Sequence, residues 1–125
     1  MYIYYQPNPL RKSVGDCVVR ALSALLDYGW VKTFLILVIE CLVQFDMPSS
    51  DAVWGAILKH RGYRKYMVPD TCPDCYTIAD FAEDHPHGLY AVGTGSHVVA
   101  VIDGDYMDSW NSGFETVSFY WRKEA

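Results

Sequence analysis

The chain has 125 residues, of which 51% are hydrophobic and 15% aromatic, a composition that suits one domain with a substantial core and excludes a disordered chain. The formal net charge is −5 and the cationic residues are scattered, apart from a short run over residues 59–65, so we expect no nucleic-acid partner. Residues 1–13 lack the charged and apolar segments of a secretory signal, and we therefore expect a cytoplasmic protein.

The first predicted helix follows an extended arm of about a dozen residues. Asp16 suits an N-cap, and the apolar residues after it recur at helical spacing. This pattern predicts a helix that begins at or beside Cys17 and stops near Gly29.

Three further helices are predicted before the strand patterns begin at Gly88. Residues 31–44 form a strongly apolar helix, too short for a membrane span of roughly 20 residues, and we expect a buried core helix and no membrane partner. Residues 47–62 predict a third helix, capped by Ser49 or Ser50. After a proline-containing connection over residues 63–75, Thr77 and Asp80 form a capping-box pattern that predicts a short fourth helix.

From Gly88 onward, β-branched and aromatic residues predominate. Strand patterns cover residues 88–93, 96–110 and 115–121, and the second of these contains the hairpin signal Asp103-Gly104. The order of helices followed by strands predicts a single α+β domain over residues 1–125, with N-terminal helices packed on one face of a C-terminal antiparallel sheet.

Cys17 is a candidate nucleophile. In the first turn of a helix, unpaired N–H groups and the helix dipole favour the thiolate, which is the reactive form. Ala21 and Ala24 lie on the same helical face and leave room beside the thiol. The alternative is a core thiol, because free cysteine is among the most buried residue types.

His97 is the candidate base that such a nucleophile needs. It opens the apolar segment 97–102, where a polar side chain costs free energy unless it is paired. His60, His85 and His87 are expected to be solvated surface residues.

Strand parity selects a residue to orient the imidazole. A two-residue turn at Asp103-Gly104 places His97 and Asp108 on the same face of the sheet, within reach of a side-chain hydrogen bond. A turn with one extra residue would select Asn111 instead.

The chain resembles the papain-like cysteine peptidases, and among them the small C39-like branch, in three motifs. These are GDC at a helix start (residues 15–17), GSHVVAVIDG on a strand (residues 95–104) and DSWNSG after it (residues 108–113). The resemblance implies a papain-like fold, with Cys17 as nucleophile, His97 as base and acid, and Asp108 holding the imidazole. It also implies that a peptide or protein substrate is cleaved at a peptide or isopeptide bond through an acyl-enzyme on Cys17.

The same resemblance implies an oxyanion site. The Cys17 backbone N–H would supply one donor, and the family usually places a glutamine six residues earlier as the second donor. Arg11 occupies that position here. We therefore expect Asn8 or Gln6 of the N-terminal arm to supply the side-chain amide.

Cys72 and Cys75 form a C-x-x-C pair. A zinc site would need Cys41 and a histidine to converge from elsewhere in the chain, and a redox pair would need to lie where a strand enters a helix, whereas this pair follows Pro69 in a loop. We expect loop thiols instead, with no metal and no cofactor. Two alternative functions stay open. One is a peptidoglycan endopeptidase or amidase of the same clan, and the other is a non-catalytic binding or assembly protein on the same fold.

Overall fold

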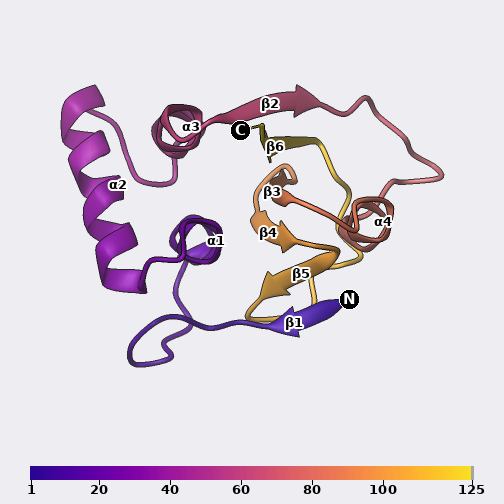
Figure 1. Cartoon of the computed structure of the whole chain (residues 1–125), viewed down its shortest axis with the longest axis horizontal. Helices are drawn as coiled ribbons and strands as arrows, with labels where there is room; N and C mark the ends of the chain where they lie inside the picture. The colour runs from indigo at the N-terminus through magenta and orange to yellow at the C-terminus, as the bar shows by residue number, and fades with distance from the viewer. Residues whose placement is uncertain (125) are drawn as a thin grey trace.

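The sheet of this protein has six strands. The computed structural model describes residues 1–124, which form four helices and this one sheet (Figure 1). In their order across the sheet, the strands are β1 (Tyr2–Tyr4), β5 (Asp105–Asp108), β4 (Val98–Ile102), β3 (Leu89–Gly93), β6 (Phe119–Lys123) and β2 (Tyr63–Met67). The α+β class is confirmed.

The sheet is mixed, so the expectation of an antiparallel sheet is wrong. The N-terminal arm, predicted only as extended chain, forms β1 and pairs in parallel with β5. All other neighbouring strands are antiparallel. The connection after the third helix also contains β2, which was not predicted and which pairs with β6.

The helices are α1 (Cys17–Leu26), α2 (Trp30–Gln44), α3 (Asp51–His60) and α4 (Ile78–Asp84). The predicted start of α1 at Cys17 is confirmed, and so is the capping box formed by Thr77 and Asp80 at α4. The first helix ends earlier than expected, with Asp27 in the left-handed conformation after it, and Gly29 precedes α2 instead.

Helices cover both faces of the sheet, which corrects the expectation that they pack on one face. One buried cluster joins α1 and α3 to the sheet through residues such as Val98 and Ala100. A second cluster joins α4 to the opposite face through Val99 and Val101, the residues that alternate with them on β4. In Figure 1, α1 accordingly lies between α2 and the sheet, and α4 lies on the other side of the sheet.

The expectation that α2 is a buried core helix is wrong. This helix packs on α1 and α3 from the outside, so only Thr33 and Leu37 of its residues are buried. Its apolar residues with more than half of their surface exposed are Val31, Leu35, Ile39, Leu42 and Val43. No single helix among residues 1–124 has the length and apolar composition of a membrane span. Helices α1 and α2 have that length and composition only when taken together, and a bend of 110° separates them.

Two of the four cysteines are joined. Cys72 and Cys75 form a disulfide, so the expectation of free thiols at these positions is wrong. The turn around Pro73 brings their Cα atoms to 4.1 Å, close enough for the bond. As a disulfide the pair offers no thiolate ligand, and within residues 1–124 no three His, Cys, Asp or Glu side chains gather as a metal site. Cys17 and Cys41 are free.

Candidate active site

Cys17 is the first residue of α1, and a buried ion network surrounds the helix start. Asp16 occupies the N-cap position, but its side chain does not cap the helix as predicted. Its carboxylate accepts hydrogen bonds from Arg20 Nη1 at 2.8 Å and Trp30 Nε1 at 2.9 Å. Arg20 and Trp30 thus engage one carboxylate oxygen each, Oδ1 and Oδ2, and orient the carboxylate away from the helix N–H groups. As the first residue of the helix, Cys17 has a backbone N–H with no partner inside the helix, so this group can bind an oxygen at the helix start.

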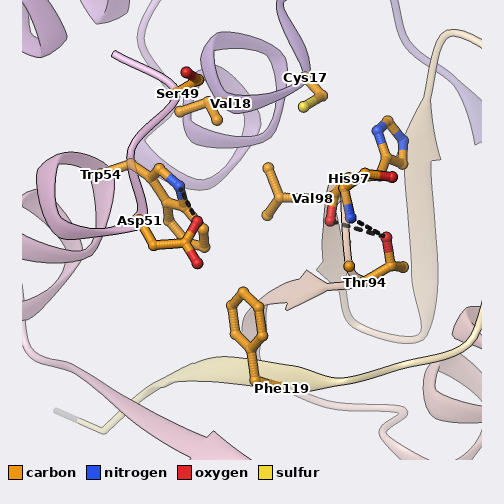
Figure 2. Close-up of a pocket in the computed structure, with 11 residues that line it drawn as sticks. Cys17, Val18, Ser49, Asp51, Trp54, Thr94, His97, Val98 and Phe119 are labelled. Carbon is orange, nitrogen blue, oxygen red and sulfur yellow. Dashed lines mark hydrogen bonds between the residues drawn. The ribbon is translucent and has the colours of Figure 1, made fainter. Parts of the chain in front are cut away.

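His97 is positioned by the turn that leads into β4. The Thr94 N–H donates to the His97 carbonyl at 2.8 Å and closes this turn. Figure 2 shows that the His97 imidazole and the Cys17 sulfur lie on the same side of one pocket. The Trp110 ring, whose centroid is 5.2 Å from that of His97, packs against the imidazole.

The hairpin between β4 and β5 brings Asp108 to the imidazole. Asp103 and Gly104 have φ angles of 48° and 84°, and Ile102 pairs with Asp105, as the predicted two-residue turn requires. His97 Nε2 is 2.6 Å from Asp108 Oδ2, so the predicted contact is confirmed. Nδ1 is then the ring nitrogen left to face the thiol.

Asn111, the residue that a longer turn would have selected, is not hydrogen-bonded to His97. Its Oδ1 accepts hydrogen bonds from the Tyr106 hydroxyl at 2.8 Å and from the Gly113 N–H at 3.1 Å. The register of the hairpin thus decides between the two residues in favour of Asp108.

Asp108 is 1% exposed, and both of its oxygens are fully engaged. Oδ2 also accepts from Ser112 Oγ at 2.6 Å, while Oδ1 accepts from Arg20 Nε at 2.9 Å and the Ser109 N–H at 2.8 Å. Burial alone would raise the pKa of this carboxyl, but the hydrogen bonds from His97 and Ser112 and the charge of Arg20 together lower it. Asp108 is therefore an anion held in one orientation.

The thiol and the imidazole shift each other's titration. Burial opposes the charged form of each group. For Cys17, hydrogen bonding to His97 and to the Val98 backbone, with the charges of His97 and Arg20, outweighs burial and lowers the thiol pKa. For His97, hydrogen bonding to Asp108 and Cys17 raises the pKa to about 9. The site thus favours a thiolate beside an imidazolium.

Arg20 belongs to the candidate site, although it was not predicted from the sequence. It is 5% exposed and joins Asp16, the residue before the thiol, to Asp108. A buried guanidinium needs such partners, since an unpaired charge in the interior is costly. The signal was present: Arg20 is the one charged residue of α1, four positions after Asp16.

Asn8 and Gln6 lie in the loop between β1 and α1. Asn8 is buried, and its Oδ1 accepts from the Leu10 N–H at 2.9 Å, while Gln6 Oε1 accepts from the Asn8 N–H at 3.3 Å. Neither residue lines the two pockets that contain Cys17. Their role as oxyanion donor stays a prediction.

The other histidines lie away from the thiol, and His85 is not the solvated residue that was expected. Its ring stacks on Phe81 with centroids 3.8 Å apart, and Nδ1 is 2.7 Å from the Phe81 carbonyl. His85 thus belongs to the aromatic packing at α4, whereas His60 and His87 are exposed as predicted.

No family model, curated protein or solved structure matches this chain.

Proposed function

We propose that the chain is a papain-like cysteine peptidase, a thiol hydrolase that cleaves peptide or isopeptide bonds through an acyl-enzyme on Cys17. The observation that carries the proposal is the alignment of three groups: a thiol at a helix start, the His97 imidazole beside it, and the buried Asp108 carboxylate on the far side of the ring. The packing of α1 against β4 and β5, which lead to these two partners, supports the papain-like assignment.

The reaction begins with attack of the Cys17 thiolate on the substrate carbonyl carbon. The Cys17 N–H donates to the oxyanion that forms. The His97 imidazolium gives its proton to the amine as the C–N bond breaks, and a thioester remains on Cys17. Neutral imidazole then takes a proton from water, the hydroxide attacks the thioester, and the acid departs as the thiolate and imidazolium are restored.

Asp108 contributes orientation and charge. Because Ser112, Ser109 and Arg20 fix its oxygens, the bond to Nε2 holds Nδ1 toward the thiol. The negative charge also stabilises the imidazolium that both halves of the reaction require. Asp108 does not itself exchange a proton.

Thiol labelling tests the activated pair. Iodoacetamide at about pH 6 should alkylate Cys17 at least about tenfold faster than Cys41, because burial and neighbouring acids raise the pKa of Cys41. His97→Ala should remove most of this advantage, and His87→Ala, at an exposed histidine, should leave it unchanged. Equal labelling of Cys17 and Cys41 in the folded protein would overturn the proposal.

Hydrolysis is the second arm of the test. A quenched-fluorescent peptide library incubated with the protein should be cleaved, and Cys17→Ala should abolish cleavage. Mass spectrometry of the wild-type protein, quenched in acid, should show acyl adducts on Cys17 alone. A reactive Cys17 that cleaves no member of the library would contradict the assignment as a peptidase.

A further inference from the structure

A pocket separates the candidate nucleophile from α3 (Figure 2). Cys17 and His97 form one side of it, and Asp51 and Trp54 of α3 form the opposite side. Val18, Val98 and Phe119 supply most of the remaining apolar surface. Apart from the Cys17–His97 pair, Asp51 is the one charged residue among those that line it.

The Asp51 carboxylate is held in place but not neutralised. Trp54 Nε1 donates to its Oδ1 at 3.2 Å, which fixes the carboxylate beside the indole ring. Within residues 1–124, Asp51 makes no ion pair. One carboxylate oxygen is therefore free to accept from a cation.

The aromatic surface beside Asp51 is rigidly packed. The Trp54 and Phe119 rings stack with centroids 5.9 Å apart. Phe119 lies directly on Gly93, where a Cβ atom would come within 2.2 Å of the ring. The two rings are 2% and 9% exposed, and Lys65 Nζ lies over the Phe119 ring, 4.6 Å from its centroid. They therefore form a fixed, mostly buried floor beside the Asp51 carboxylate.

We propose that this pocket, the Asp51 pocket, binds a lysine or arginine side chain of the substrate within two residues of the bond that Cys17 attacks. The apolar atoms of Val18 and Phe119 at the pocket can contact a long aliphatic stem, and the Asp51 carboxylate matches a cationic head. An acidic side chain would meet like charge. This inference deepens the proposed function and rests on it.

The experiment compares peptide vinyl sulfones that differ in one side chain. Lysine, norleucine or glutamate is placed at each of the two positions before the warhead, and the rate of Cys17 modification is measured by mass spectrometry. At one of these positions, the lysine probe should react at least about fivefold faster than the norleucine probe, and glutamate should be slowest. Equal rates for all three probes would overturn the Asp51 pocket.

Substitutions assign the preference to Asp51. Asp51→Asn should reduce the lysine probe's rate to that of norleucine and leave the norleucine rate within about twofold, whereas Asp51→Lys should favour glutamate. Glu83→Gln removes an exposed carboxylate of α4 outside the pocket and should change none of these rates. A lysine preference that survives Asp51→Asn would overturn the assignment.

Iodoacetamide separates this inference from the proposed function. Rapid labelling of Cys17 with no preference for lysine would overturn the pocket alone. If Cys17 labels slowly, the proposed function fails, and binding of N-acetyl-lysine methylamide to Cys17→Ser then tests the pocket. The Trp54 indole N–H resonance should shift with this ligand but not with the norleucine analogue. An unchanged resonance would overturn the inference.

Discussion

The Arg20 guanidinium donates through Nε to Asp108 at 2.9 Å, although the two residues are 88 positions apart in the chain. Through Nη1 the same group donates to Asp16, immediately before Cys17. The helix that presents the thiol and the hairpin that presents the carboxylate are thus joined by one buried cation. The link thus holds the start of α1 beside the carboxylate that contacts the imidazole.

Loss of Arg20 should destabilise the fold. Arg20→Met would leave Asp16 and Asp108 buried without their cation, and the free energy of unfolding should fall by about 3–5 kcal/mol. Urea denaturation followed by circular dichroism measures this change. Arg122→Met removes an exposed guanidinium and should change stability by less than about 0.5 kcal/mol. Similar effects of the two substitutions would show that the buried network adds little.

Replacement of Asp108 should slow peptide cleavage far more than replacement of Asn111. Asp108→Asn removes the charge that favours the imidazolium, so library cleavage should slow by about tenfold or more and the His97 pKa should fall. Asn111→Ala removes only the partner of Tyr106 and Gly113 and should leave cleavage within about twofold. Nuclear magnetic resonance titration of His97 in each variant reports the pKa directly. A large loss in Asn111→Ala alone would indicate a different hairpin register.

The pH profile of kcat/KM should be bell-shaped with an alkaline limb near pH 9. As pH falls through the lowered pKa of Cys17, the thiolate is protonated, and as pH rises through about 9, His97 loses the proton that the leaving amine needs. Asp108→Asn should move the alkaline limb to lower pH, because the carboxylate helps to raise the His97 pKa. Rates measured from pH 4 to 10 test this. A wild-type limb near the ordinary histidine value would contradict it.

Substitutions in the N-terminal arm should lower the turnover of substrate without changing the reactivity of the Cys17 thiol. If Asn8 or Gln6 stabilises the oxyanion, its replacement by alanine should lower kcat by up to about a hundredfold. Iodoacetamide labelling of Cys17 should stay unchanged, because that reaction forms no oxyanion. Thermal denaturation of Asn8→Ala separates this effect from loss of the hydrogen bond that Asn8 accepts from the Leu10 N–H. Full turnover in both variants would place the second donor elsewhere.

The disulfide should be visible in the number of free thiols. Unfolded without reductant, the chain should titrate two thiols, from Cys17 and Cys41, and four after reduction. Cys75→Ser should leave library cleavage unchanged, because neither pocket at Cys17 includes the 72–75 loop. Four thiols without reductant would restore the loop-thiol expectation.

Local sequence patterns were sufficient to predict the core of the candidate site. The apolar spacing after Asp16 placed the start of α1 at Cys17, and the turn type at Asp103-Gly104 fixed the register that joins His97 to Asp108. Both features depend on neighbouring residues, which a sequence displays directly.

The features that were missed depend on distant partners. Strand β1 forms because β5, about a hundred residues later, offers an edge, and β2 forms against β6. The exposure of α2 likewise depends on what packs against it, since an apolar helix is buried only on the sides that meet another element. To predict the place of Arg20 in the site, one would have to know that the fold brings both Asp16 and Asp108 to its guanidinium.

The long separation between α1 and the β4–β5 hairpin also sets an order of events during synthesis. Cys17 leaves the ribosome early, but Asp108 is translated about 90 residues later, a delay of roughly 5 to 20 seconds. During that interval the thiol has neither its base nor its orienting carboxylate, so it keeps the low reactivity of an ordinary cysteine. Under the proposed function, the growing chain is therefore protected from its own nucleophile until the hairpin docks on α1.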